Sequence, residues 1–180
     1  EIARQASSLR STAATMANWL AGVLHPDGQI PFFNDAAFGI SPPPLQILDY
    51  AHTLGVVRPL AERGLHYYVA SGYAAIHQAE QFVVLDVANV GPDYIPGHAH
   101  ADTLSFEWSL KGQRVLVNSG TSVYGLSEER LRQRQTAAHN TVVVNGQDSS
   151  EVWSGFRVAR RARPFAVETG QSGNGVFVKA

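Results

Sequence analysis

The stretch PGHAHADTLSFEW (residues 96–108) places His98, His100 and Asp102 at alternate positions in front of a strand pattern. In TLSFEWSL (103–110), apolar and polar residues then alternate strictly. A period of two predicts a β-strand with an apolar face and a polar face. If the strand extends backwards without a bulge, the two histidines and Asp102 lie on its apolar face.

Polar side chains at the border of a core or a cleft need partners, because burying them without hydrogen bonds is costly. Two readings are equally open from the spacing: a metal ion bound by the histidines, or a network of hydrogen bonds. A cupin site is the obvious comparison for His-x-His, but it needs a Glu soon after the second His. Here Glu107 comes seven positions after His100 and lies on the other strand face, which disfavours that reading.

Further segments with strand character follow the same period. They are QFVVLDVANV (81–90), RVLVN (114–118), NTVVV (140–144), GFRVARRAR (155–163), FAVET (165–169) and GVFVK (175–179). LKGQ (110–113) and the Asn-Gly pair at 145–146 predict tight turns between them. Because no helical crossover separates the strands, we expect a mainly antiparallel sheet that forms a sandwich or barrel.

The first 64 residues have a different pattern. Apolar residues recur on one helical face over 2–24, and Ser41 with Pro42 predicts the start of a second helix that ends near Leu54. Glu1 opens this helical pattern without a capping residue, and the chain stops inside a strand pattern. We therefore expect the chain to be cut from a longer one.

The composition excludes several classes of protein. Hydrophobic residues make up 44% and charged residues 16% of the 180 residues, which argues for a packed core and against disorder. A net charge of −1 argues against a general nucleic-acid binder. The sequence has no cysteine for a disulfide or a thiolate metal site, and no apolar run reaches the roughly 20 residues of a membrane span.

Three long blocks carry a family resemblance: GHAHADTLSFEW, VLVNSGTSVYG and RQRQTAAHNTVVVNGQDSSEVW. Two further blocks, DGQIPFFNDAAFG and YYVASGYAAIH, precede them. Together they cover residues 25–160 and resemble the heparinase II/III-like proteins, which include heparinases and alginate and oligoalginate lyases. The resemblance implies a mainly β fold with N-terminal helices, in which an antiparallel β-sandwich follows the last helices of an α/α toroid. Residues 1–64 would be the end of the toroid and 65–180 a truncated sandwich.

The resemblance also implies an activity, β-elimination on a polysaccharide that contains uronic acid. The sugar carboxylate is neutralised, a base removes the C5 proton, and an acid protonates the departing oxygen. The implied partners are an acidic polysaccharide and the missing toroid of the same protein, in the periplasm or outside the cell. The toroid would supply the principal Tyr acid, and Tyr124 lies in the wrong block to replace it.

The family's functional residues map onto named positions here. His98 matches the histidine that faces the cleft and takes part in catalysis, whereas His100 and His139 match two zinc ligands. Asn118, in VNSGT, stands where the family usually has an Asp in a VDPGT-like block. An amide is a poorer zinc ligand than a carboxylate, so we expect weak zinc or an empty site, with Asp102 as a possible substitute ligand.

Three further residues are candidates for substrate binding. Arg134 directly precedes the block that contains His139, and a guanidinium group pairs well with carboxylates and sulfates. Asn34 and Asp35, in the loop after the first helix, could line the toroid end of the cleft or merely form a turn. The rival to a lyase is a non-catalytic glycan-binding or structural module of a polysaccharide biosynthesis or export system, and a cupin-type metal enzyme ranks third.

Overall fold

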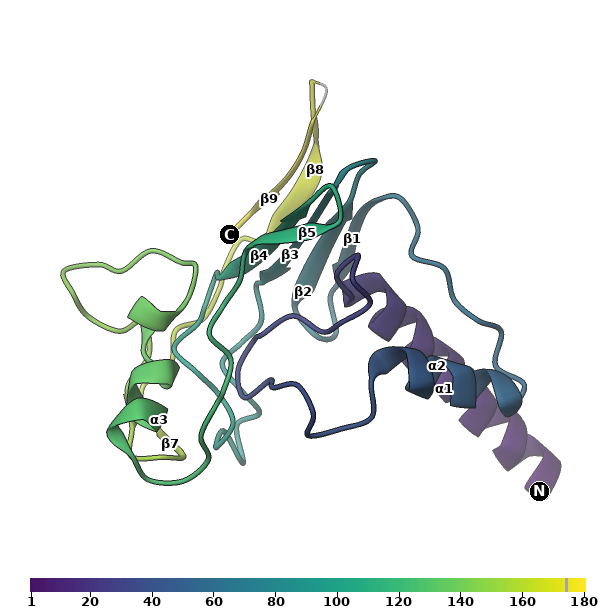
Figure 1. Ribbon diagram of the computed structural model, residues 1–180, viewed down its shortest axis with the longest axis horizontal. Helices are drawn as coiled ribbons and strands as arrows, with labels where there is room; N and C mark the ends of the chain where they lie inside the picture. The colour runs from purple at the N-terminus through teal and green to yellow at the C-terminus, as the bar shows by residue number, and fades with distance from the viewer. Residues whose placement is uncertain (174) are drawn as a thin grey trace.

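The computed structural model describes residues 1–173 and 175–180 (Figure 1). Two helices come first, α1 (Ile2–Val23) and α2 (Pro44–Thr53), and they pack against each other. An antiparallel sheet follows, with the strand order β1-β2-β3-β4-β5. Its strands are β1 (Gly64–Tyr68), β2 (Tyr73–His77), β3 (Gln81–Asp86), β4 (Phe106–Leu110) and β5 (Gln113–Leu116).

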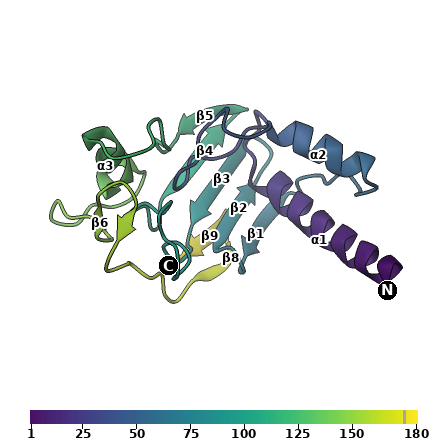
Figure 2. The same cartoon turned by 90° about the horizontal axis from the view of Figure 1, so that it is seen from below.

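The rest of the chain forms smaller elements beside this sheet. They are α3 (Glu128–Arg134), a 3₁₀ turn (Thr136–Ala138), the pair β6 (Val152–Trp153) and β7 (Arg157–Val158), and the hairpin β8 (Glu168–Ser172) and β9 (Gly175–Lys179). In both views the β8–β9 hairpin lies against the five-stranded sheet, and β8 contacts β1 (Figures 1 and 2). The α3 region lies at the end of the molecule opposite to the N-terminus (Figure 1).

These layers confirm the expected fold class, a mainly β, antiparallel protein with N-terminal helices. One face of the sheet packs against the loop between α1 and α2, where Phe33 joins Ala75, Phe82 and Val84 in a buried cluster. A second cluster joins the two helices around Leu48. β1 begins next to the predicted boundary at residue 64, and the division of the chain into two domains stays a prediction.

Some expected elements are wrong. Residues 140–144 do not form a strand; Val144 makes an isolated bridge to Gln147 across the Asn-Gly turn. In the 155–163 segment only Arg157–Val158 pairs as a strand. The helix α2 begins at Pro44 instead of Pro42, and both α3 and the short strands β1 and β2 were missed.

The segment before β4 also differs from the expected extended strand. Leu104 has a φ of 62°, and the backbone N–H of Ser105 donates to the carbonyl of Asp102 at 2.9 Å, so the chain turns there. His98, His100 and Asp102 therefore do not continue a face of β4. On β4 itself, Glu107 and Ser109 are the buried side chains, whereas Trp108 on the opposite face is half-buried.

A helix can cross a bilayer only if it is long and apolar enough to span the hydrocarbon core. Within residues 1–173 and 175–180, no helix combines the length and the apolar character that crossing a membrane requires.

Candidate active site

The loop between α1 and α2 places Asp35 at the centre of a cluster of polar groups. Its carboxylate accepts hydrogen bonds from Nδ1 of His98 at 2.9 Å, Nε2 of His100 at 2.8 Å and the hydroxyl of Thr121 at 3.0 Å. Both terminal nitrogens of Arg130 also donate to it, one of them at 2.8 Å. We call these residues the Asp35 centre. It joins the α1–α2 loop, the segment before β4, the segment after β5 and the helix α3.

Arg130 supplies the positive charge of this centre from α3, and its side chain is fully buried. Its Nε donates to the carbonyl of Gly155 at 3.0 Å, which fixes the plane of the guanidinium group. The sequence analysis did not select this arginine. The signal that could have found it is Ser127 followed by two glutamates, which is typical of a helix start; Ser127 indeed caps α3 by accepting from the N–H of Arg130 at 3.1 Å.

Burial by itself would raise the pKa of Asp35, but its partners dominate. The hydrogen bonds from His100, Arg130 and His98 together hold the pKa of this carboxyl group well below its ordinary range. Asp35 is therefore ionised at neutral pH. It can act as a fixed acceptor that orients the two imidazole rings.

His98 is the exposed member of the Asp35 centre, with 69% of its side chain accessible. Its Nδ1 lies 2.9 Å from Asp35 and 3.1 Å from the hydroxyl of Tyr124. Donation of the Nδ1 proton to the carboxylate leaves Nε2 with a free lone pair. Tyr124 stacks beside the ring and lies over Arg130, whose Cζ is 5.5 Å from the Tyr124 ring centroid.

His100 and His139 form a buried imidazole pair behind His98. Nδ1 of His100 lies 3.3 Å from Nε2 of His139. Burial lowers the pKa of His139 to about 4; the neighbouring His100 adds to this shift and Asp102 opposes it. Within the described part of the chain, Nδ1 of His139 has no hydrogen-bond partner.

The same pair is where the resemblance implies zinc. Two ring nitrogens meet as two ligands of one ion do, and Asp35 bonds the far nitrogen of His100, as a carboxylate does behind a metal-bound histidine. The third ligand is lacking. The side-chain oxygen of Asn118 accepts the backbone N–H of Asn140 at 2.9 Å, and residues 1–173 and 175–180 contain no group of three His, Cys, Asp or Glu side chains that could hold a metal. The donors present do not complete a zinc site.

The two other candidates for substrate binding are held inside the structure. Arg134 is fully buried and donates to backbone carbonyls, among them Ala99 at 2.9 Å and Ser154 at 3.1 Å, so its burial weighs against contact with a substrate. Asn34 has a φ of 52° and accepts the N–H of His100 at 3.2 Å. Both residues join the loops around the Asp35 centre, and a substrate role for either stays a prediction.

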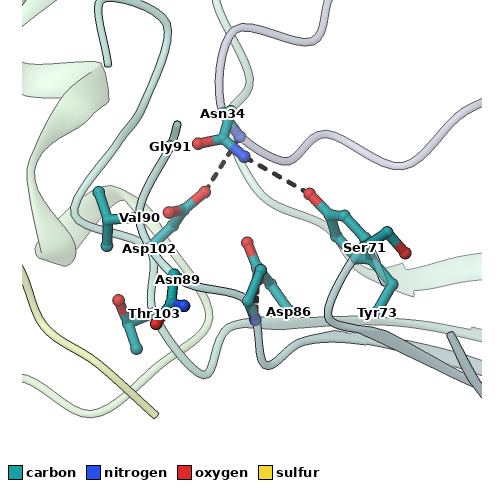
Figure 3. A pocket seen from close by; sticks show the side chains of 10 residues that line it. Asn34, Ser71, Tyr73, Asp86, Asn89, Val90, Gly91, Asp102 and Thr103 are labelled. Carbon is teal, nitrogen blue, oxygen red and sulfur yellow. Dashed lines mark hydrogen bonds between the residues drawn. The ribbon is translucent and has the colours of Figure 1, made fainter. Parts of the chain in front are cut away.

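A second polar centre lies on the other side of Asn34 (Figure 3). It is a cavity of about 180 Å³ whose lining includes Asp86, Asp102, Tyr73 and Asn34. Figure 3 shows both carboxyl groups directed towards it, with Asp102 accepting the backbone N–H of Asn34 at 3.0 Å. Burial raises the pKa of Asp86 well above its ordinary value, and the charge of Asp102 raises it further. We call this the Asp86 centre.

Comparison with solved structures supports the fold. A crystal structure of heparinase III superimposes with a TM-score of 0.62 at 17% identity, over 94% of this chain and 29% of that one. A heparan sulfate lyase HepC from Pedobacter heparinus gives 0.58 at 18% identity, over 86% and 25%. A heparinase III with methylated lysines gives 0.57 at 22% identity, over 83% and 25%. The chain thus spans between a quarter and a third of the solved structures that it matches.

Sequence comparison gives the family. A search of curated protein sequences gave no match. The family described as "Heparinase II/III-like, C-terminal" matches residues 61–179. This range is most of the chain and includes all five strands of the large sheet, but neither of the helices α1 and α2. The resemblance read from the histidine blocks is confirmed, and the chain belongs to the heparinase II/III-like family.

Proposed function

We propose that the chain is part of a polysaccharide lyase that cleaves a polymer containing uronic acid by β-elimination. One observation carries this proposal: the exposed imidazole of His98 is held by a buried carboxylate at 2.9 Å and stands beside the Tyr124 hydroxyl at 3.1 Å. A positioned imidazole with one free nitrogen is the commonest proton-transfer group in enzymes. The family membership supports the same reaction class.

In this reaction His98 removes the proton from C5 of the uronate. Asp35 accepts the Nδ1 proton, so Nε2 presents its lone pair to the sugar and takes the proton as the C4–O bond breaks. The imidazolium that results is stabilised by the same carboxylate. Asp35 takes the single Nδ1 proton of neutral His98, so the Tyr124 hydroxyl, whose oxygen lies 3.1 Å from Nδ1, keeps its O–H free to donate to the sugar carboxylate, whose charge opposes C5 ionisation.

The remaining parts of the reaction are assigned outside these residues. Because the solved relatives are three to four times longer than the segment they share with this chain, we propose that the helical toroid supplies the acid for the departing oxygen and the opposite wall of the cleft. We place the protein in the periplasm or outside the cell, where such polymers occur. Zinc is weakly bound or absent in this proposal, and no step depends on it.

The test uses the protein encoded by the full reading frame. It is incubated with a panel of uronic-acid polymers that includes heparan sulfate and alginate, and the absorbance of the unsaturated uronate product is followed. On the polymer that reacts, His98→Ala should lower kcat by about 10²–10⁴-fold, the usual contribution of a positioned proton-transfer group. The fold should be unaffected, because the His98 side chain is mostly exposed.

His52→Ala is the matched control, since it removes an exposed histidine from α2, outside the Asp35 centre. Its kcat should equal that of the wild type. If the wild type binds a polymer of the panel and forms no unsaturated product from any of them, the protein is a glycan-binding module and the lyase proposal is wrong.

A further inference from the structure

We propose that Glu107 is a positioning residue for the Asp35 centre: one oxygen of its carboxylate holds in place the two loops that carry Asp35 and Thr121. The inference deepens the proposed lyase function and rests on it for its kinetic consequence. Glu107 lies on β4 and its side chain is fully buried. The family resemblance assigned it no role, and the strand pattern gave it only a face.

The Oε1 atom of Glu107 makes the two contacts that matter. It accepts the backbone N–H of Phe32 at 2.7 Å and the backbone N–H of Asn118 at 3.0 Å. The first residue lies three positions before Asp35, and the second lies three positions before Thr121. A single acceptor atom therefore fixes the approach of both loops to the centre.

The two loops also contact each other directly beyond Glu107. The backbone N–H of Thr121 donates to the carbonyl of Ala36 at 3.0 Å, and the hydroxyl of Thr121 donates to Asp35 at 3.0 Å. Gly120 has a φ of 59°, and a Cβ atom built on it would lie 2.5 Å from the same Ala36 carbonyl. The loops therefore meet backbone to backbone, and Glu107 attaches both of them to the sheet.

The Oε2 atom has a separate set of partners. It lies 2.9 Å from Nε2 of His25 and 3.5 Å from a terminal nitrogen of Arg114. His25 is in turn 2.7 Å from the hydroxyl of Ser109 on the same face of β4. These contacts satisfy the buried group. Arg114 also donates to the carbonyl of Ile30 at 2.9 Å, so the Oε2 side reaches the first part of the Asp35 loop, but the N–H groups of Phe32 and Asn118 are bound by Oε1.

Because Oε1 alone binds the N–H groups of both loops, the positioning role of Glu107 can be separated experimentally from its negative charge. β4 pairs with β3 on one side and β5 on the other, so Glu107 stands on a rigid part of the sheet. Asp35 sets the orientation of His98 through one hydrogen bond, and a displacement of about 1 Å in such a group can cost about 10²-fold in rate. The catalytic rate should therefore follow the Oε1 contacts rather than the charge of the side chain.

The test compares Glu107→Gln with Glu107→Asp on the polymer that the wild type cleaves. Glutamine keeps the length of the side chain and a carbonyl oxygen at the Oε1 position but loses the charge. Aspartate keeps the charge but is one methylene too short to reach both N–H groups. We expect kcat to stay within about threefold for Gln and to fall by about 10²-fold for Asp, with KM little changed in both. A similar fall in both variants, or a larger fall for Gln, overturns the proposal.

A second readout is independent of activity. Amide hydrogen exchange is followed in the segments 30–36 and 117–122 of the same proteins. In Glu107→Asp, and in Glu107→Leu if it folds, the amides of Phe32 and Asn118 should exchange about tenfold faster or more, because each loses its acceptor. In Glu107→Gln they should stay protected. Equal protection in Gln and Asp contradicts the inference even if no polymer is cleaved.

Ser109→Ala is the matched control, because it alters the same buried face of β4 and the His25 contact but leaves Oε1 untouched. It should preserve kcat and the protection of both amides. A wild type that cleaves no polymer of the panel overturns the lyase function alone, whereas the exchange pattern judges the role of Glu107. The two proposals can therefore fail separately.

Discussion

Asn34 and Asp35 are neighbours in the sequence, yet they belong to two polar centres with opposite electrostatics. Asp35 faces His98, His100 and the guanidinium group of Arg130, and its pKa lies well below the ordinary range. Asn34 borders the cavity of Asp86 and Asp102, where burial and the neighbouring carboxylate raise the pKa of Asp86. Burial opposes ionisation of both Asp35 and Asp86, but only Asp35 has partners that outweigh it.

The difference separates a buried carboxylate whose charge is compensated from one whose charge is not. In the Asp35 centre the buried anion is compensated, so its position and protonation are fixed and it can orient an imidazole ring. Among the described residues that line the Asp86 cavity, none carries a positive charge. The protonated form of Asp86 is therefore favoured. Removing Arg130 from the Asp35 centre, or the ionisable group of Asp86 from the Asp86 centre, tests this difference.

The largest effect on stability should follow from removing the positive charge of Arg130, which compensates the Asp35 carboxylate. Arg130→Met leaves the Asp35 carboxylate without its guanidinium partner, and breaking a buried ion pair typically costs about 3–5 kcal/mol. Urea unfolding at neutral pH measures the change. The double variant Arg130→Met with Asp35→Leu should recover part of the loss, since it leaves no buried charge alone.

Arg132→Met is the matched control for this experiment. Arg132 lies on the same helix and pairs with Glu129 on the surface, so its replacement should have little effect on the unfolding transition. Unfolding of Arg130→Met at the wild-type urea concentration would show that the pair does not hold the centre together.

Replacing the ionisable side chain of Asp86 in the Asp86 centre should stabilise the protein. Asp86→Asn keeps the acceptor for the N–H of Ala88, which the wild-type side chain binds at 2.8 Å, but cannot ionise. The folded-state pKa of Asp86 is raised above the ordinary 3.8, so its contribution to the free energy of unfolding is fully present below pH 3.8 and is lost as the pH rises through the raised value. The variant avoids this loss.

The expected result is therefore a variant that needs more urea to unfold at neutral pH than the wild type, with a difference that shrinks as the pH falls towards 3.8. Asp93→Asn is the control, because the Asp93 side chain is 94% exposed and its replacement should leave the pH profile unchanged. A difference that is constant over the whole pH range would mean that ionisation of Asp86 is not the cause.

The smallest effect concerns metal. Zinc added to the wild type should raise Tm little, because Asn118 offers no carboxylate to the His100–His139 pair. Asn118→Asp would supply a direct carboxylate ligand. Because the loss of even an outer-shell partner costs about tenfold or more in metal affinity, zinc should bind this variant at least about tenfold more tightly and should raise its Tm. Stoichiometric zinc in the purified wild type would contradict the expectation of a weak site.

The sequence could predict some of the elements and fewer of their contacts. The period of two identified β3, β4 and β9, and the family blocks selected His98, His100 and Asp35, which the structure brings together. The pattern could not tell which face of β4 is buried, because it assumes that apolar residues point inwards. Here Glu107 points inwards, since the backbone of two loops supplies its partners.

Arg130 and Arg134 also show that sequence position does not predict tertiary contacts. Sequence position favoured Arg134 as the one that meets substrate, but its side chain is used entirely within the structure. Arg130, four residues earlier and one helical turn away, is the arginine that meets Asp35. Which of two arginines on one helix face reaches a given carboxylate depends on tertiary packing, and local spacing does not contain that information.

The contact of Gly120 with the Ala36 carbonyl has a consequence for protein engineering. Because even one methyl group does not fit between these backbones, position 120 cannot be used to tune substrate preference. Mutational libraries aimed at new glycans should leave Gly120 and Tyr124 intact and vary exposed residues beside Tyr124 in the chain, such as Leu126.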